Sequence, residues 1–430
     1  MTMALLIKNG RVLDPASGLD DTFDILIAEG KIQEICKGID ISKAAISQEI
    51  NAKNLIVAPG LIDMHTHLRE PGHEYKETIQ TGSRSAAAGG FTTIVCMANT
   101  NPVNDAASVT KYILEKARLE ACVNVLPVAA ITKGLQGESL AEMGDLKAAG
   151  IVAVSDDGKT IKSAEVMRRG LEYARSFSLP VICHCEDSDL SKDGVMHEGF
   201  TSMCLGMRGI PPAAEEVIVA REIALSEWTG HPVHIAHVST AGSVRIIRKA
   251  KARGVPVTAE TAPHYFTLTD AAVAGFDTST KVNPPLRSGK DVEAIQEGLR
   301  DGTIDAIASD HAPHSSLEKD IEFDNAAFGM IGLETSLPLT LALVHKNILT
   351  LAEAIAKYTI NPARILHIDK GTISLDAPAD LTLIDLEAEF EVDRKKSYSK
   401  SKNSPFHGWR LKGRAAYTIV AGRVVFPFNT

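Results

Sequence analysis

The stretch GLIDMHTHLREPG, residues 60 to 72, places His65 and His67 two positions apart in an otherwise apolar run. Side chains alternate along a β-strand, so the polar residues of this run are expected to share one face: Asp63, His65, His67 and Arg69. Imidazole is a preferred ligand of zinc and similar cations, and this spacing delivers two rings to one ion. The pair alone is weak support, because single histidines in apolar strands are more often structural.

Outward from this stretch, short apolar runs alternate with longer amphipathic segments from Leu61 to Ser309. Eight runs have the character of strands: LIDMHTH, TTIVCMAN, NVLPVAAI, IVAVSDD, PVICHC, PVHIAHV, PVTAET and DAIASD. The segments between them resemble helices, and several end in glycine, as helices commonly do. Eight β-then-α units in series predict an α/β fold with a parallel (β/α)8 barrel of the TIM type rather than an open sheet.

The two ends of the chain have a different pattern. Residues 4–57 and 379–430 contain short alternating strands joined by Asn-Gly, Glu-Gly and Ala-Gly turns, which indicates antiparallel β structure. The segments IKNGRVLD and IVAGRVVF also resemble one another. We therefore predict a barrel over residues 59–369 and one small discontinuous β-sandwich domain built from residues 1–58 and 370–430.

Composition and charge narrow the class of protein. The chain has 430 residues with 45 Lys and Arg against 54 Asp and Glu, a formal net charge of −9, which argues against a nucleic-acid or anionic-membrane partner. A hydrophobic content of 44% is ordinary for a globular protein. No apolar run approaches the roughly 20 residues of a membrane span, and the first residues lack signal-peptide features. We expect a cytoplasmic protein.

Six cysteines are scattered without CxxC spacing, which favours buried reduced thiols over a disulfide framework. Cys183 and Cys185 flank His184, so their side chains should face away from it and fill the core. The basic run RKKSYSKSKNSP, residues 394–405, is compatible with an anion site, but runs of like charge are usually solvated. We interpret this run as a solvated loop.

Candidate ligands fall at the predicted strand ends, where the working residues of such barrels lie. Strand 1 ends in His65 and His67, strand 4 in Asp156 and Asp157, strand 5 in His184, strand 6 in His237 and strand 8 in Asp310. On strand 4, Ala153, Ser155 and Asp157 share a face of small residues that could point into a barrel, which favours Asp157 over Asp156. Together these histidines and aspartates predict a metal centre.

These motifs carry a resemblance to a known family. The chain resembles a dihydroorotase of the amidohydrolase superfamily, in its longer bacterial class, over essentially its whole length. The matching motifs occur in family order: APGLIDMHTHLREPG, TTIVCMANTNPVND, SDDG, HCED, IAHVS, KVNPPLR, ASDHAPH, FGMIGLET and NSPFHG.

The resemblance implies a centre of two metal ions, usually zinc. It assigns His65, His67 and Asp310 to one ion, His184 and His237 to the other, and a bridging carboxylate between them. Many relatives use a carbamylated lysine as the bridge, whereas here Asp157 matches the aspartate of this class and Lys159 is the alternative. Because aspartate is shorter, we expect one metal to be held weakly.

The implied reaction is the reversible conversion of dihydroorotate to N-carbamoyl-L-aspartate in pyrimidine biosynthesis. Two metals about 3.5–4 Å apart can share a hydroxide and polarise a carbonyl, and Asp310 is expected to carry the proton. Arg69 is expected to grip the substrate carboxylate with two parallel bonds. The resemblance adds substrate contacts from His67, Asn99, Asn283, His314 and the backbone of Phe328 and Gly329, and residues 312–329 could form a lid.

Other readings remain open. Asn99 could equally be an ordinary turn residue. Hydantoinases or dihydropyrimidinases and allantoinases share the barrel and the paired histidines, but Arg69 and Asn99 favour a ring that bears a carboxylate. A catalytically silent partner of aspartate transcarbamoylase is the alternative of a different class. For the enzyme we expect a small-molecule substrate, a homodimer and possible association with aspartate transcarbamoylase.

Overall fold

The computed structural model describes residues 4–40 and 46–427. Eight parallel strands form the barrel: β6 (Leu61–Thr66), β7 (Phe91–Cys96), β8 (Asn124–Ala129), β9 (Ala153–Ser155), β10 (Val181–Cys183), β13 (Val233–Ile235), β14 (Val257–Thr261) and β15 (Ala306–Ile307). They are hydrogen-bonded in the order β15-β14-β13-β10-β9-β8-β7-β6. Each of the eight predicted runs contains one of these strands, and the predicted barrel is confirmed.

The barrel closes between its first and last strands through single contacts rather than a ladder. Thr66 and His311 form an isolated parallel bridge, and the His67 N–H donates to the His311 carbonyl at 2.9 Å. The carboxylate of Asp63 accepts the Ser309 N–H at 3.1 Å. Burial raises the pKa of this Asp63 carboxyl to about 6. The strand that carries the paired histidines is therefore tied directly to the strand that precedes Asp310.

Strand β6 departs from the strict alternation expected from the sequence. Its pairing with β7 shifts register between Leu61 and Ile62 and again between Asp63 and Thr66. Ile62 and Met64 consequently pack in the same apolar cluster as interior residues of the other strands, although simple alternation places them on the face opposite Asp63 and His65. The side chain of His65 therefore points to the candidate site because of the local irregularity of β6, and not because side chains alternate regularly along this strand.

Alternation does hold on the other strands and divides the core into two layers. Ala153, Ile182 and Ala306 pack with Ala363 and Leu366 of α12 (Ile360–Leu366), which covers the end of the barrel away from the candidate site. The neighbouring residues of the same strands pack instead in the larger outer cluster beneath the helices: Val154, Cys183 and Ile307. The expected inward face of Ala153 and Asp157 agrees with this packing.

Helices surround the barrel and several begin and end at the expected signals. The helices are α1 (Ile79–Gly89), α2 (Ala107–Glu120), α3 (Met143–Ala149), α4 (Ala164–Arg175), α5 (Phe200–Leu205), α6 (Ala213–Thr229), α7 (Ala241–Ala252), α8 (Gly289–Arg300), α9 (Ser316–Lys319), α10 (Leu333–His345) and α11 (Leu351–Ala356). The side chain of Thr78 caps α1, and Gly90 ends it at a φ of 92°, a conformation that glycine adopts without a steric penalty. Two short strands, β11 (Met196–His197) and β12 (Gly209–Ile210), flank α5 in an insertion that the sequence pattern did not reveal.

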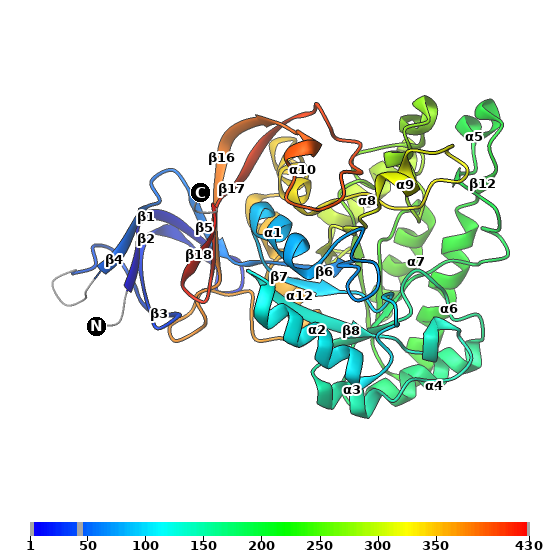
Figure 1. Cartoon of the computed structure of the whole chain (residues 1–430), viewed down its shortest axis with the longest axis horizontal. Helices are drawn as coiled ribbons and strands as arrows, with labels where there is room; N and C mark the ends of the chain where they lie inside the picture. The colour runs from blue at the N-terminus through cyan, green and yellow to red at the C-terminus, as the bar shows by residue number, and fades with distance from the viewer. Residues whose placement is uncertain (1–3, 41–45, 428–430) are drawn as a thin grey trace.

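The chain ends form a second sheet, seen at the left of Figure 1 beside the barrel. Its strands are β1 (Ala4–Asp14), β2 (Leu19–Ala28), β3 (Lys31–Cys36), β4 (Ile46–Asn51), β5 (Ile56–Pro59), β16 (Leu381–Glu391), β17 (Arg410–Val420) and β18 (Arg423–Phe426). Both chain ends contribute to it, as predicted. Most pairs are antiparallel, but β1 pairs in parallel with β4 and with β5, so the sheet is mixed.

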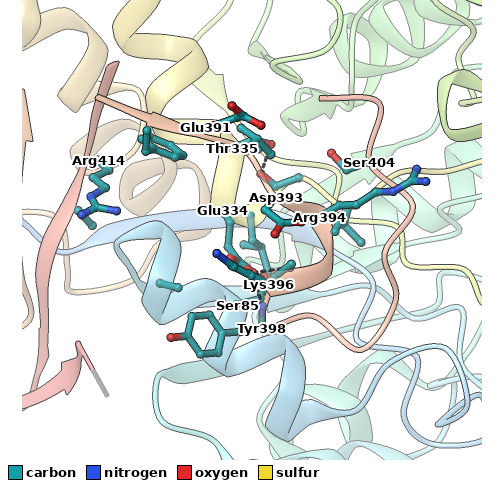
Figure 2. Close-up of a pocket in the computed structure, with 18 of the residues that line it drawn as sticks. Ser85, Glu334, Thr335, Glu391, Asp393, Arg394, Lys396, Tyr398, Ser404 and Arg414 are labelled. Atoms are coloured by element: carbon teal, nitrogen blue, oxygen red, sulfur yellow. Dashed lines mark hydrogen bonds between the residues drawn. The ribbon is translucent and has the colours of Figure 1, made fainter. Parts of the chain in front are cut away.

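The basic run at 394–405 is only partly the solvated loop that we expected. Lys395 and Lys396 are exposed, but Ser399, Ser401, Asn403 and Ser404 are buried. Figure 2 shows the start of the run around Glu334 of α10, whose carboxylate accepts from Ser85 at 2.9 Å, Ser397 at 2.6 Å and the Tyr398 N–H at 2.8 Å. The cavity beside it, about 300 Å³, contains none of the candidate ligands. The second half of the run thus packs into the barrel mouth.

Two further predictions concern cysteines and membrane spans. All six cysteines are free thiols, and Cys96, Cys183 and Cys185 are buried. Within residues 4–40 and 46–427, no helix combines the length and the apolar character that a membrane crossing requires.

Candidate metal centre

Six side chains converge at the C-terminal end of the barrel strands. His65 lies in β6, and the other five follow their strands closely: His67, Asp157, His184, His237 and Asp310. All six are buried, and they are the six residues that the sequence had predicted as ligands. Parallel strands bring their carboxyl ends to one edge of the barrel, which explains how residues far apart in sequence meet.

Asp157 lies at the middle of the histidines. Its Oδ1 is 3.3 Å from His65 Nε2, 3.6 Å from His184 Nδ1 and 3.4 Å from His237 Nε2, and its Oδ2 is 3.6 Å from His67 Nε2. One carboxylate therefore faces four imidazoles from three strand ends. A carboxylate in this position can share a metal ion with the imidazoles around it.

The remaining distances divide the cluster into two groups. Asp310 Oδ1 is 3.3 Å from His67 Nε2 and 3.7 Å from His65 Nε2. On the other side of Asp157, His184 Nδ1 is 2.9 Å from His237 Nε2. Potential ligand atoms of His65, His67 and Asp310 all lie within 4.8 Å of one another, and so do those of His65, Asp157 and His237. Each of these two groups, which share His65, could hold a metal ion.

Three of the imidazoles are oriented by acceptors behind them. His65 Nδ1 is 2.7 Å from Glu260 Oε1, His67 Nδ1 is 3.0 Å from Asn99 Oδ1, and His184 Nε2 is 3.0 Å from Glu186 Oε2. Because these oxygens only accept, the nitrogen that faces each of them carries the proton. The opposite nitrogen of each ring then presents a lone pair to the centre, as a metal ligand must.

Electrostatics keep the two aspartates ionised. Burial alone would raise the pKa of Asp157, but the imidazoles of His65, His184 and His237 around it outweigh burial and hold that pKa well below its usual range. Burial likewise opposes ionisation of Asp310, yet the neighbouring imidazoles lower its pKa. Ionised carboxylates and imidazole lone pairs are the donor set that suits zinc.

Two atoms at the centre make no hydrogen bond although they are buried. They are His65 Nε2 and Asp157 Oδ1, which face one another. An unsatisfied buried polar atom is costly, and such atoms in a native fold call for a missing partner such as an ion. A divalent cation between them would satisfy both atoms, so the residues present fit the metal that the sequence implied.

Backbone strain is concentrated at the same place. Arg69, His237 and Asp310 have φ angles of 63°, 36° and 48°, in the left-handed region that residues other than glycine rarely occupy. Each such residue costs on the order of 1–3 kcal/mol and persists only where its surroundings enforce it. Strain at two candidate ligands and at the expected carboxylate-binding arginine is typical of a functional site.

The expected carboxylate-binding group lies at the mouth of the barrel. Arg69 Nη2 is 3.2 Å from His314 Nε2, and its Nε donates to the Pro313 carbonyl at 3.2 Å. Arg69 reaches this position because the backbone turns at its positive φ after β6 has ended, and not because a strand face continues. Lys76 Nζ lies 3.5 Å from His314 Nδ1 and adds a third basic group.

The other expected substrate contacts lie around the same opening, and Asn283 and Gly329, like Asn99, already hydrogen-bond within the protein. Asn283 donates from Nδ2 to Glu186 at 2.7 Å. The Gly329 N–H donates to the Lys281 carbonyl at 2.8 Å, so this amide would have to exchange partners to bind a substrate. Gly329 has a φ of 137°, and a Cβ there would lie 2.7 Å from the Ala312 carbonyl oxygen, so only glycine fits. Phe328 lines the opening next to Asn283.

The structure also shows where the alternative bridging residue lies. Lys159 is exposed, while Asp157 is the residue that faces the histidines.

The segment 312–329, the predicted lid, is held in this conformation by Lys319, whose buried ammonium donates to the carbonyls of Thr278 at 2.7 Å and Ala327 at 2.6 Å. The lid remains a prediction from sequence.

Sequence reasoning missed three residues that support the site: Glu186, Glu260 and Asn403. Glu186 and Glu260 orient His184 and His65, and the signals were present in the runs HCED and VTAET. Asn403 donates to the carbonyls of Ala312 at 3.1 Å and Gly329 at 3.0 Å and accepts the His314 N–H at 3.2 Å. It lies in the NSPFHG motif, inside the run that we had taken for a solvated loop.

Comparison with known proteins identifies the family. Residues 54–243 match the family described as dihydro-orotase-like, and residues 287–426 match an amidohydrolase family. The chain is 58% identical to a protein named dihydroorotase from Geobacter sp. (strain M21), over 99% of both chains.

The chain belongs to the dihydroorotase family. A second member, from Geobacter sulfurreducens (strain ATCC 51573 / DSM 12127 / PCA), is 59% identical over 98% of this chain and 99% of its own length. Among solved structures, the L-hydantoinase (dihydropyrimidinase) from Arthrobacter aurescens superposes with a TM-score of 0.88 at 26% identity, covering 99% of this chain and 96% of that one. A D-hydantoinase with a TM-score of 0.86 is 24% identical and supports the fold alone.

Proposed function

We propose that this chain catalyses the dihydroorotase reaction, the reversible conversion of dihydroorotate and water to N-carbamoyl-L-aspartate. The observation that carries the proposal is Asp157 at the centre of four imidazoles, with Asp310 beside them, in a chain 58% identical to a named dihydroorotase over its whole length. Family membership supplies the reaction, and the geometry supplies residues able to perform it.

The proposed cofactor is a pair of zinc ions. His65, His67 and Asp310 would hold one, His184 and His237 the other, and Asp157 would bridge them. Bound there, such ions lower the pKa of a water molecule and polarise the ring amide carbonyl. The family and the clustered His and Asp side chains support a metal ion, while zinc and the number two are our proposal.

The chain's own residues then account for binding and proton transfer. Hydrolysis breaks the ring amide C–N bond, adds the hydroxyl of water to the carbonyl carbon and one proton to the nitrogen, and leaves a second carboxylate. Asp310 is positioned to accept the proton of the water and pass it to the departing nitrogen. Arg69 and His314 would bind the carboxylate that substrate and product share, and Asn99, Asn283, Phe328 and Gly329 would contact the ring.

The rival function is that of the structural neighbours named hydantoinase. Ring substrates without a carboxylate would leave the guanidinium of Arg69 without its anion at the mouth. A panel of dihydroorotate, dihydrouracil, hydantoin and allantoin distinguishes the two functions. We expect turnover of dihydroorotate alone, and turnover of only the rings without a carboxylate would refute the proposal.

Replacing Arg69 with methionine is expected to weaken substrate binding. The apolar side chain keeps much of the volume but cannot donate to a carboxylate, and hydrogen bonds to charged groups contribute about 1.5–3 kcal/mol. KM for dihydroorotate should therefore rise roughly 10- to 100-fold, with a much smaller change in kcat. Arg69→Lys should be intermediate, because it keeps the charge without the paired geometry. Steady-state kinetics with an unchanged KM for Arg69→Met would exclude this role.

The proposal extends to assembly. We further propose a homodimer, association with an aspartate transcarbamoylase and a cytoplasmic location. Sedimentation of the purified chain, alone and with a transcarbamoylase, tests the first two.

A further inference from the structure

Strand β14 supplies none of the six candidate ligands, yet one of its residues touches the centre. Glu260 is 1% exposed, and its Oε1 lies 2.7 Å from His65 Nδ1. On the other side of the same ring, His65 Nε2 is 3.3 Å from Asp157 Oδ1 and 3.7 Å from Asp310 Oδ1. His65 and His67 thus each lie within 3.7 Å of both aspartates, and Glu260 lies directly behind His65.

Glu260 is itself held in place from the interior of the barrel. Its second oxygen, Oε2, lies 3.5 Å from His234 Nε2, and His234 Nδ1 is 2.8 Å from the Thr258 hydroxyl. Thr258 and Glu260 are two apart on β14, and His234 is paired with Thr258 across the β13–β14 ladder. A row of neighbouring polar groups therefore runs from the partly buried Thr258 through the buried His234 and Glu260 to His65.

We infer that Glu260 is a positioning residue of the metal centre, which fixes the tautomer and the ring orientation of His65 and is braced by His234. A carboxylate can only accept, so the His65 proton is held on Nδ1 and the Nε2 lone pair faces the two aspartates. The negative charge behind the ring also increases its basicity as a ligand. Without this partner the ring could adopt the other tautomer, which would turn an N–H toward the cation.

This inference rests on the proposed role of His65 as a metal ligand. A positioning role also explains why polar side chains lie inside the barrel, where apolar side chains would have a lower free-energy cost of burial. Burial works against ionisation of Glu260, but the imidazoles of His234 and His65 beside it lower its pKa to about 2. His234, a buried histidine that is not among the six candidate ligands, thereby gains a defined role.

The test compares zinc binding by the full-length protein and its Glu260→Gln variant, using competition with a chromophoric chelator. Glutamine preserves the shape of the side chain but removes the charge and allows the amide to present either group to His65. Loss of such a partner typically weakens metal affinity 10- to 100-fold. The matched control is Glu222→Gln, because Glu222 is similarly buried at 2% exposure but pairs with Arg221 and hydrogen-bonds none of the six ligands.

The inference predicts that Glu260→Gln loses affinity for at least one zinc ion and alters the absorption spectrum of the cobalt-substituted protein, while Glu222→Gln does neither. His234→Gln, which leaves the Glu260–His65 contact in place, should give a smaller loss in the same direction and serves if Glu260→Gln does not fold. Unchanged zinc affinity and cobalt spectrum in a folded Glu260→Gln protein would overturn the inference. Failure of the unmodified protein itself to bind zinc would instead refute the proposed function.

Discussion

Replacing Asp310 with asparagine is expected to lower kcat for dihydroorotate about 10²- to 10⁴-fold, the range for loss of a positioned proton carrier. Asparagine preserves the size of the side chain and can still offer an oxygen to the cation, but its amide cannot accept and return a proton. The five other ligands remain, so bound zinc should persist. Turnover and metal content of the same preparation are the measurements.

The matched control for this variant lies at the other end of the same strand. Asp305 precedes β15 and accepts from the Ala259 N–H at 2.8 Å and from Lys251 at 2.6 Å, away from the candidate site. Asp305→Asn should therefore change stability and leave kcat near that of the unmodified protein. An Asp310→Asn protein that keeps its zinc and its turnover would refute the proton-carrier assignment.

Replacing Asp157 with asparagine is expected to abolish activity by a different route, through loss of metal. The carboxylate faces four imidazoles, and a neutral amide cannot bridge two cations. In the metal-free protein the change also removes the anion that compensates buried imidazoles, which should lower the free energy of unfolding by on the order of 3 kcal/mol. Zinc content by elemental analysis and chemical denaturation measure the two effects.

The adjacent aspartate provides the control. Asp156 is equally buried but faces away from the histidines and accepts the Ile131 N–H at 2.7 Å and the Thr132 N–H at 3.0 Å. Asp156→Asn should therefore destabilise the fold while leaving zinc content unchanged. If Asp157→Asn bound as much zinc as Asp156→Asn, the bridging position would belong to another residue.

The barrel could be predicted from sequence because its signals are repeated. Eight apolar runs separated by amphipathic segments cannot easily be read another way, and the Gly-containing turns at both ends mark the second sheet. The insertion of β11, α5 and β12 gave no such signal, since two-residue strands have no measurable period. The parallel pairing of β1 with β4 and β5 depends on contacts between distant segments, which local patterns do not encode.

The six candidate ligands were predictable because each follows a strand, and strand ends meet in a barrel. The directions of side chains on irregular backbone were not predictable. The register shifts in β6 and the positive φ of Arg69 replace the simple alternation that the sequence suggested. Glu260 was missed because the role of a carboxylate within a strand becomes clear only when the structure shows that it contacts His65, which is far away in the sequence. Asn403 was missed because a basic, serine-rich run looks solvated until its burial is seen.

The most direct test of the central claim is a crystal structure of the zinc-loaded protein with dihydroorotate, with anomalous scattering recorded at the zinc edge. The account predicts two zinc peaks on either side of the Asp157 carboxylate, one near His65, His67 and Asp310 and one near His184 and His237, with the substrate carboxylate on Arg69. A zinc peak that Asp157 does not touch, or a substrate carboxylate bound away from Arg69, would contradict it.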